Sequence, residues 1–193
     1  MIRRSFLTSL LAAALASPAL GISKANATKL VEALVADINA VTSSGQSVAA
    51  MARKFEGIFK KYAAVSVIAR FVLGPDARTA SAPQLRRFTD AFVGYIARKY
   101  AKRFRDFQNA DIKVERTRQS GQNFDVDCVA AVPGSGPIRV TFRISDRSGK
   151  DLMFDLLIEG ISLLKSEAVE IRALLDQYGG NIDELASDLH KRG

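Results

Sequence analysis

The chain offers few residues that could carry out acid–base, nucleophilic or metal chemistry. Its single histidine, His190, lies close to the C-terminal end, and its single cysteine is Cys128. A Ser-His-Asp or Cys-His catalytic arrangement would have to use His190, in a part of the chain where structure tends to fray. Zinc sites combine several His and Cys ligands, so the sequence predicts neither a metal site nor a cofactor.

Two pairs of acidic residues have a spacing that could place both carboxylates on one side of a strand. They are Asp125 with Asp127 and Asp155 with Glu159. Such a pair can perform general acid–base catalysis, but the solvated side of a strand also contains such residues, and we favour the solvated interpretation. No Gly-rich phosphate loop follows a predicted strand, because "GPD" and "GSGP" have the composition of turns. The sequence therefore predicts a protein that is not an enzyme and that binds by shape.

The N-terminal segment, residues 1–27, has the organisation of a secretory signal peptide. A basic start is followed by an apolar run from Phe6 to Ala16 and then by small residues. This run is shorter than the roughly 20 apolar residues that a membrane-spanning helix needs, which favours a cleaved signal over a retained anchor. Cleavage fits after "ALG" at Gly21 or after "ANA" at Ala27, and we favour Ala27. We therefore predict an exported protein in which residues 28–193 form a single domain.

Export changes the interpretation of the charge and of the lone cysteine. The formal net charge is +8, to which Arg3, Arg4 and Lys24 of the signal segment contribute, and "RRSFL" resembles a twin-arginine export signal. The remaining basic excess indicates a solvated surface, anionic lipid headgroups or an acidic protein face rather than nucleic acid. Cys128 has no partner for an intramolecular disulfide, so the hydrophobic core must hold the fold alone.

Apolar residues at helical spacing predict four helices in the first half of the chain. These helices cover residues 30–41, 47–61, 64–73 and 81 to about 107. The fourth begins with Ser81 as N-cap, Pro83 in the first turn and Gln84 completing a capping box. Its aromatic and aliphatic stripe either belongs to the core or forms one wall of a ligand cavity. The stripe consists of Leu85, Phe88, Phe92, Tyr95, Ile96, Tyr100, Phe104 and Phe107.

From Ile112 onward the apolar residues recur at every second position, which is the period of a β-strand. Four such segments are separated by turn sequences at Ser120-Gly121, "PGSG" and residues 146–150. Four successive strands with short turns predict an antiparallel meander with one apolar face. The residues predicted to face inward are Val126, Cys128, Val140, Phe142, Phe154, Leu156 and Ile158. Two helices complete the chain, so the predicted class is α+β, an antiparallel four-stranded meander packed against a layer of helices.

The C-terminal part contains a motif that is similar to a known family. "FDLLIEGISLL", followed by a helix and "LLDQYGGNIDELASDL", resembles the C-terminal signature of the MlaC-type periplasmic phospholipid-binding proteins, the toluene-tolerance auxiliary family. The matching motif residues are Asp155, Ile158, Glu159, Gly160, Ser162 and Leu163. "FVLG" at residues 71–74 and "KYAKRF" around Tyr100 resemble the middle helices of the same family. The chain departs from the family in having no Trp, and in lacking a Tyr-Arg pair that often begins the penultimate helix, where residues 165–168 read "KSEA".

The resemblance implies a periplasmic carrier that encloses the acyl chains of a phospholipid in a lipid cavity between sheet and helices. Its implied partners are an inner-membrane ABC-transporter complex and an outer-membrane lipoprotein complex. Passage of about thirty methylenes through water at about 0.8 kcal/mol each would cost more than ~20 kcal/mol, so a carrier must enclose both chains. The cavity-lining residues would be Phe71, Phe88, Phe92, Tyr95, Ile96, Tyr100, Val126, Cys128, Val140, Phe142, Phe154, Leu156, Ile158 and Ile161. The alternatives are a carrier of another lipid, such as a hopanoid, and a small cone-like α+β enzyme that acts on an apolar substrate.

Overall fold

The computed structural model describes residues 22–105, 111–132, 134 and 136–193. Residues 1–21, which hold most of the predicted signal peptide, and Phe107 of the predicted stripe lie outside the described residues. The elements are α1 (Lys24–Thr42), α2 (Val48–Tyr62), α3 (Val65–Leu73), a 3-10 turn (Gly74–Arg78), α4 (Ala82–Arg105), β1 (Asp111–Ser120), β2 (Asn123–Ala131), β3 (Ile138–Ser145), β4 (Leu152–Ile158), β5 (Ile161–Ser162), α5 (Leu163–Gln177) and α6 (Ile182–Leu189). The fold is α+β, as the sequence predicts. Among the described helices none has the length and apolar character needed to cross a membrane.

The helix ends follow from local sequence. The capping box of α4 is confirmed, because Ser81 Oγ accepts a hydrogen bond from the Gln84 amide at 3.3 Å and Gln84 Oε1 accepts one from the Ser81 amide at 3.0 Å. Helix α3 ends at Gly74, whose φ of +67° favours glycine. The guanidinium of Arg172 on α5 covers this turn and donates to the carbonyls of Phe71 at 2.8 Å and Val72 at 3.2 Å. Residues far apart in sequence therefore fix α3 against α5.

Helix α1 begins before the favoured cleavage position. Ser23 caps its first turn by accepting a hydrogen bond from the Asn26 amide, and Ala27 is fully buried. The amide of Ile22 donates to Asp146 Oδ2 at 3.0 Å, which attaches the start of the helix to the turn between β3 and β4. Residues 22–27, which the sequence prediction placed in the signal peptide, thus form part of the folded domain in the structure.

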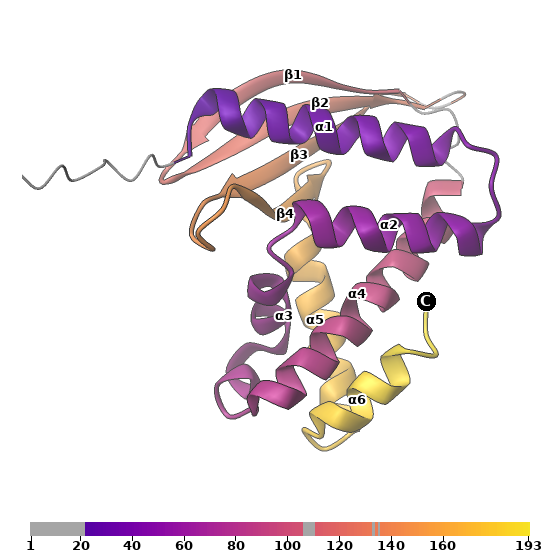
Figure 1. The fold of residues 1–193 in the computed structure, drawn as a ribbon, viewed down its shortest axis with the longest axis vertical. Coiled ribbons are helices and arrows are strands. Elements are labelled where there is room, and N and C mark those ends of the chain that lie inside the picture. Colours follow the sequence, from indigo (N-terminus) through magenta and orange to yellow (C-terminus); the bar gives the residue numbers. More distant parts are fainter. Residues whose placement is uncertain (1–21, 106–110, 133, 135) are drawn as a thin grey trace, which may run out of the picture.

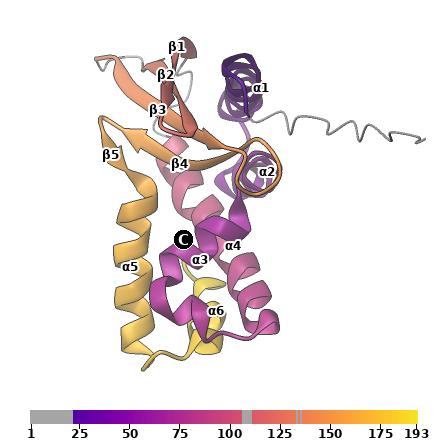
Figure 2. The same cartoon turned by 90° about the vertical axis from the view of Figure 1, so that its left-hand side faces the viewer.

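The sheet is an antiparallel meander in the order β1-β2-β3-β4-β5 (Figures 1 and 2). It contains five strands rather than the predicted four, because the two-residue strand β5 pairs with the end of β4. The turn between them is Glu159-Gly160, with φ values of +49° and +79°, the pattern of a two-residue hairpin turn that favours glycine. The Glu159 carboxylate pairs with the Arg139 guanidinium at 2.9 Å on the surface. A two-residue strand is too short to produce a visible alternation in the sequence.

One side of the sheet is the predicted apolar side. Val126, Cys128, Val140 and Phe142 are buried together against α1 and α2, which confirms their predicted orientation. The alternation predicted along β4 is interrupted by a bulge at Phe154, the extra residue of β4 between Asp155, which pairs with Arg143, and Met153, which pairs with Ile144. Because a bulge shifts the register by one residue, Met153 takes the place opposite the buried Ile144. Phe154 instead lies at the margin of the sheet, with the Arg143 guanidinium 5.0 Å from its ring centre.

The solvated interpretation of the acidic pairs is wrong for one member of each pair. Asp125 and Asp155 are each only 5% exposed, whereas Glu159 is exposed. Asp125 pairs with Arg118 at 3.0 Å and with Arg143 at 3.4 Å, and Arg143 also lies 3.7 Å from Asp155. Buried carboxylates are tolerated when cations and hydrogen-bond donors surround them. Alternation along a strand predicts on which side of the sheet a side chain lies. It does not predict whether a charged side chain there is paired with another residue or solvated.

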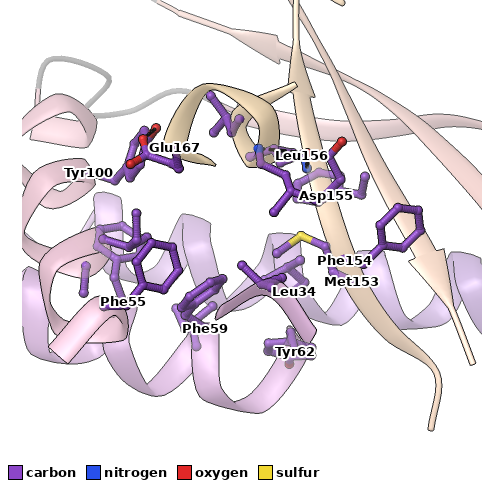
Figure 3. Close-up of a pocket in the computed structure, with 18 of the residues that line it drawn as sticks. Leu34, Phe55, Phe59, Tyr62, Tyr100, Met153, Phe154, Asp155, Leu156 and Glu167 are labelled. Atoms are coloured by element: carbon purple, nitrogen blue, oxygen red, sulfur yellow. Dashed lines mark hydrogen bonds between the residues drawn. The ribbon is translucent and has the colours of Figure 1, made fainter. Parts of the chain in front are cut away.

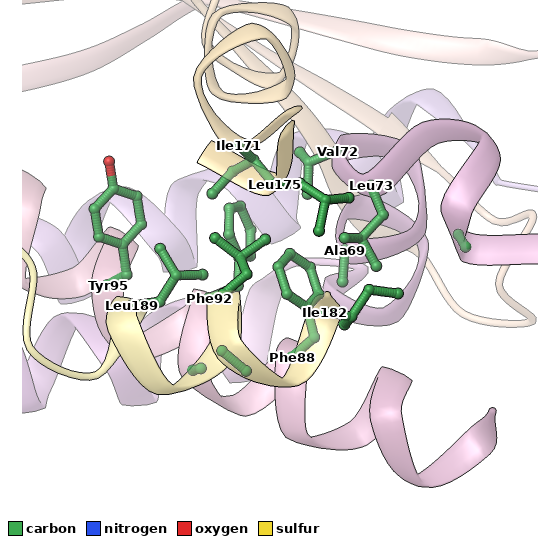
Figure 4. Close-up of a cluster of buried hydrophobic side chains, with 14 of the residues drawn as sticks. Ala69, Val72, Leu73, Phe88, Phe92, Tyr95, Ile171, Leu175, Ile182 and Leu189 are labelled. Atoms are coloured by element: carbon green, nitrogen blue, oxygen red, sulfur yellow. The ribbon is translucent and has the colours of Figure 1, made fainter. Parts of the chain in front are cut away.

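The interior consists of two hydrophobic clusters that lie at opposite ends of the molecule (Figures 1 and 2). The helical cluster joins α3, α4, α5 and α6, with Phe88 and Phe92 stacked at a ring separation of 5.8 Å at its centre (Figure 4). The sheet cluster joins β2 and β3 to α1, α2 and the C-terminal half of α4. Met153 packs against both clusters. The seam between the two clusters is where a cavity can form.

Candidate functional site

An apolar pocket lies where the two clusters meet (Figure 3). Its cavity volume is about 140 Å³, and its walls come from all four N-terminal helices, from β3 and β4 and from the start of α5. Apart from two tyrosines and two acidic residues the lining side chains are aliphatic, aromatic or methionine. Each cluster packs closely within itself, so the unfilled volume collects at the seam.

The structure brings part of the predicted site together. Seven of the predicted residues line the pocket, namely Phe92, Ile96, Tyr100, Phe142, Phe154, Asp155 and Leu156. Five others are buried in the two clusters without lining the pocket, namely Phe88, Tyr95, Val126, Cys128 and Val140. Ile158 is half-buried at the end of β4, and Glu159, Gly160 and Ser162 form the hairpin turn and the helix cap beyond it. Phe71 and Ile161 are 44% and 65% exposed and lie outside the pocket, because they follow the outer surface of α3 and the turn after β4.

Sequence reasoning missed the walls that α1 and α2 contribute. Leu34 and Ile38 of α1 line the pocket, as do four residues of α2, which are Phe55, Ile58, Phe59 and Tyr62. The apolar stripe of α2 was visible in the sequence, but a stripe at helical spacing is also what a plain core requires. The aromatic content of that stripe does not distinguish the two, because Phe88 and Tyr95 of the similar α4 stripe belong to the core.

The polar groups that border the pocket are already paired with other protein groups. The Tyr62 hydroxyl donates to Asp37 at 2.7 Å, and the Tyr100 hydroxyl donates to Glu167 at 2.7 Å. Asp155 and Glu167 are each bonded to several donors. A ligand in the pocket therefore meets hydrocarbon surface and is offered few free hydrogen-bonding groups.

A buried ion cluster between α4 and α5 closes one end of the pocket. The Lys99 ammonium lies 2.8 Å from Glu167 and 2.7 Å from Glu170, and the side chains of Lys99 and Glu167 are only 17% and 6% exposed. Burial alone would lower the pKa of Lys99, but its hydrogen bonds to the two carboxylates outweigh burial and raise that pKa. Burial and a hydrogen bond to Glu170 raise the pKa of Tyr95 to about 12. Lys99 therefore stays charged and Tyr95 stays neutral at neutral pH, and the cluster holds the two helices together.

The motif residue Asp155 closes the opposite end. One carboxylate oxygen accepts hydrogen bonds from the Leu156 amide at 2.8 Å and the Leu164 amide at 3.1 Å, and the other accepts one from the Ser162 hydroxyl at 2.8 Å. Ser162 Oγ in turn caps α5 by accepting from the Lys165 amide at 3.1 Å. Asp155 and Ser162 therefore fix the direction in which α5 leaves the sheet, and this direction sets the width of the pocket.

The single histidine and the single cysteine lie on separate elements of the described structure. Within the described ranges no group of three His, Cys, Asp or Glu side chains is placed to hold a metal ion. His190 is exposed at the C-cap of α6. Burial raises the pKa of the Cys128 thiol to about 12, so it stays neutral and poorly nucleophilic.

The fold and the pocket define a class of protein, namely α+β domains that leave an apolar cavity between a meander sheet and a helical layer. Within this class the chain belongs to the MlaC protein family, whose sequence profile matches residues 28–191. This match confirms the family resemblance that the C-terminal motif indicates.

Two known proteins resemble the chain over much of its length. The intermembrane phospholipid transport system binding protein MlaC of Haemophilus influenzae is 26% identical over 125 residues, which are 62% of this chain and 58% of that relative. The chain thus matches somewhat more than half of the relative's length. A solved structure of a phospholipid-binding protein from Ralstonia solanacearum, in complex with a phospholipid, has a TM-score of 0.68 at 17% identity and covers 84% of this chain and 98% of its own. The two chains therefore share the fold.

Proposed function

We propose that the protein is a periplasmic carrier that encloses the acyl chains of a phospholipid and moves the lipid between membranes. The observation that carries the proposal is the pocket, whose walls are apolar and whose bordering polar groups are already paired with other groups of the protein. The Haemophilus influenzae relative is named for intermembrane phospholipid transport, and the Ralstonia solanacearum structure contains a phospholipid. Both support a phospholipid as the ligand of this family member.

The energetics of an acyl chain agree with such a pocket. Each methylene transferred from water to an apolar environment contributes about 0.8 kcal/mol, so about ten enclosed methylenes contribute about 8 kcal/mol. That figure corresponds to a Kd of about 1 μM before the costs of ordering and association. A carrier that binds only hydrocarbon can therefore hold a lipid without any reactive group.

The pocket must widen to take two acyl chains. Its volume of about 140 Å³ lies below the roughly 300–1,000 Å³ typical of pockets for drug-sized ligands. Its walls belong to two separate clusters that meet at Met153, so the seam can open without breaking the packing inside either one. We expect α5 and β4 to move away from α2 as the chains enter.

The proposed carrier acts between two membrane-bound partners. We propose that it exchanges lipid with an inner-membrane ABC-transporter complex and an outer-membrane lipoprotein complex, as its family membership implies. An N-terminal signal peptide, removed on export, would deliver it to the periplasm. The basic excess of the chain suits anionic lipid surfaces or acidic faces of such partners.

A transfer assay tests the carrier function. Donor vesicles that contain a fluorescent phospholipid are separated from acceptor vesicles by a membrane that passes the protein but not the vesicles. We expect lipid to reach the acceptor at a rate proportional to protein concentration. No transfer above the protein-free rate would contradict the proposal, and chemical conversion of the lipid would favour the enzyme alternative.

A further inference from the structure

A second hollow, of about 260 Å³, adjoins the apolar pocket at the surface. We call it the vestibule; it lies between α3, the start of α5 and the turn that joins β3 to β4. Ile68, Phe154, Asp155 and Leu164 line both the vestibule and the pocket, so the two spaces share a wall. In Figure 3 Phe154 points away from the aromatic residues of the pocket, toward the margin of the sheet. A ligand whose chains lie in the pocket would place its next groups in the vestibule.

The two sides of the vestibule differ in chemistry. The α3 side presents Val67 and Phe71, which are 46% and 44% exposed although they are large apolar residues. The opposite side, from the end of β3, the β3–β4 turn and α5, carries three cationic side chains and two hydroxyl groups. These are Arg143, Arg147, Lys165, Ser145 and Ser148. An apolar side facing a cationic side matches the border between the acyl chains and the headgroup of a phospholipid.

Two of the three cations are available to a ligand. Arg143 is compensated by Asp125 at 3.4 Å and Asp155 at 3.7 Å. In contrast, no ion pair joins Arg147 or Lys165 to a carboxylate of the described residues, and the Arg147 guanidinium donates only to the neutral Gln122 side chain at 3.2 Å. The amides at the start of α5 are already used, since Asp155 and Ser162 accept from Leu164 and Lys165. The free donors of the vestibule are therefore side chains.

We propose that the vestibule binds the phosphate of the lipid headgroup through Arg147 and Lys165. This inference rests on the proposed function, since it takes the acyl chains to occupy the adjoining pocket. A phosphodiester carries one negative charge and two free oxygens, which suit the fork of a guanidinium and the point charge of an ammonium. The cations beside the pocket, Lys99 and Arg143, are already paired with carboxylates, so the phosphate stays in the vestibule while the chains go further. Headgroup recognition thus depends on the charge of the phosphate, and the group beyond it faces solvent.

The test compares lipids with identical acyl chains and different polar ends. Protein is incubated with vesicles of phosphatidylcholine that contain equal amounts of phosphatidylglycerol and diacylglycerol, and bound lipid is quantified by mass spectrometry. The variant is Arg147→Gln with Lys165→Gln. The control is Lys54→Gln with Arg86→Gln, which removes the same charge from exposed residues of α2 and α4 outside both hollows. We expect the unmodified protein and the control to prefer phosphatidylglycerol over diacylglycerol by about tenfold or more, a difference of 1.4 kcal/mol in binding free energy. The variant should bind these two lipids equally.

Each outcome bears on one proposal. Equal preference for phospholipid in the variant and the control would overturn the headgroup site while leaving the carrier function intact. Absence of both phospholipid and diacylglycerol from the unmodified protein would overturn the carrier function itself. Inorganic phosphate and glycerol phosphate are titrated separately by NMR. If either binds at the vestibule at micromolar concentration, the site is one for free phosphate compounds, and the assignment to a lipid headgroup is wrong.

Discussion

Replacement of Leu156 by Trp should fill the pocket from the sheet side. Leu156 lies on β4 opposite Phe142, and both side chains line the pocket. Trp adds about six heavy atoms, which would displace roughly six methylene groups of ligand, or about 5 kcal/mol of transfer free energy. Relaxation of the seam recovers part of this energy. Even if only a third is lost, the Kd for a phospholipid rises by more than tenfold.

The matched control is Val140→Trp on the neighbouring strand. Val140 is 8% exposed and belongs to the sheet cluster, but it does not line the pocket. Overpacking there should lower the free energy of unfolding by about 1–3 kcal/mol while leaving lipid per folded protein unchanged. Binding is measured by titration with a fluorescent phospholipid, and stability by urea unfolding. Undiminished binding in folded Leu156→Trp, or an equal loss in Val140→Trp, would refute the assignment of the pocket.

Four further predictions follow from the described contacts. Glu167→Gln should lower the free energy of unfolding by about 1–3 kcal/mol, measured in urea, because it weakens the bond that α5 makes to Lys99. Burial would raise the pKa of Glu170, but hydrogen bonds from Lys99 and Tyr95 outweigh burial and lower that pKa from 4.5. The ionised Glu170 carboxylate therefore stabilises the fold above pH 4.5, and this stabilisation is lost as the pH falls through the lowered pKa. The difference in thermal midpoint between the unmodified protein and Glu170→Gln should accordingly vanish in acid. Cys128 should react with a thiol reagent only after unfolding, since burial raises its pKa to about 12, and rapid reaction of the native protein would contradict its placement. Intact mass of the exported protein should give Ile22 as the first residue, because Ser23 caps α1 and Ala27 is fully buried in the domain, and a start at Thr28 would contradict this.

The fold class was predictable because its signals are local. Helical spacing, the capping box at Ser81 and the alternation of Val126 and Cys128 each depend on a few consecutive residues, and all three appear in the structure as predicted. Strand β5 and the bulge beside Ile144 were not predictable, because both depend on pairing between strands. The burial of Asp125 and Asp155 was missed for the same reason, since their arginine partners, Arg118 and Arg143, lie on neighbouring strands.

The candidate site was predictable only in part. The α4 stripe contains Phe92, Ile96 and Tyr100, which line the pocket, and Phe88 and Tyr95, which do not. All five lie on one broad apolar face, and whether each meets cavity or core depends on which helix packs beside it. The crossing of α2 over α4 and the direction in which Asp155 sends α5 decide this, and neither is encoded in the spacing along α4.

The most direct test of the central claim is the lipid content of the protein purified from the periplasm. Solvent extraction with lipid mass spectrometry identifies the lipid, and the mass of the intact complex gives its stoichiometry. The account predicts about one diacyl phospholipid per chain, and clearly less in Leu156→Trp. A protein that carries no acyl lipid, both as purified and after incubation with phospholipid vesicles, would contradict the account.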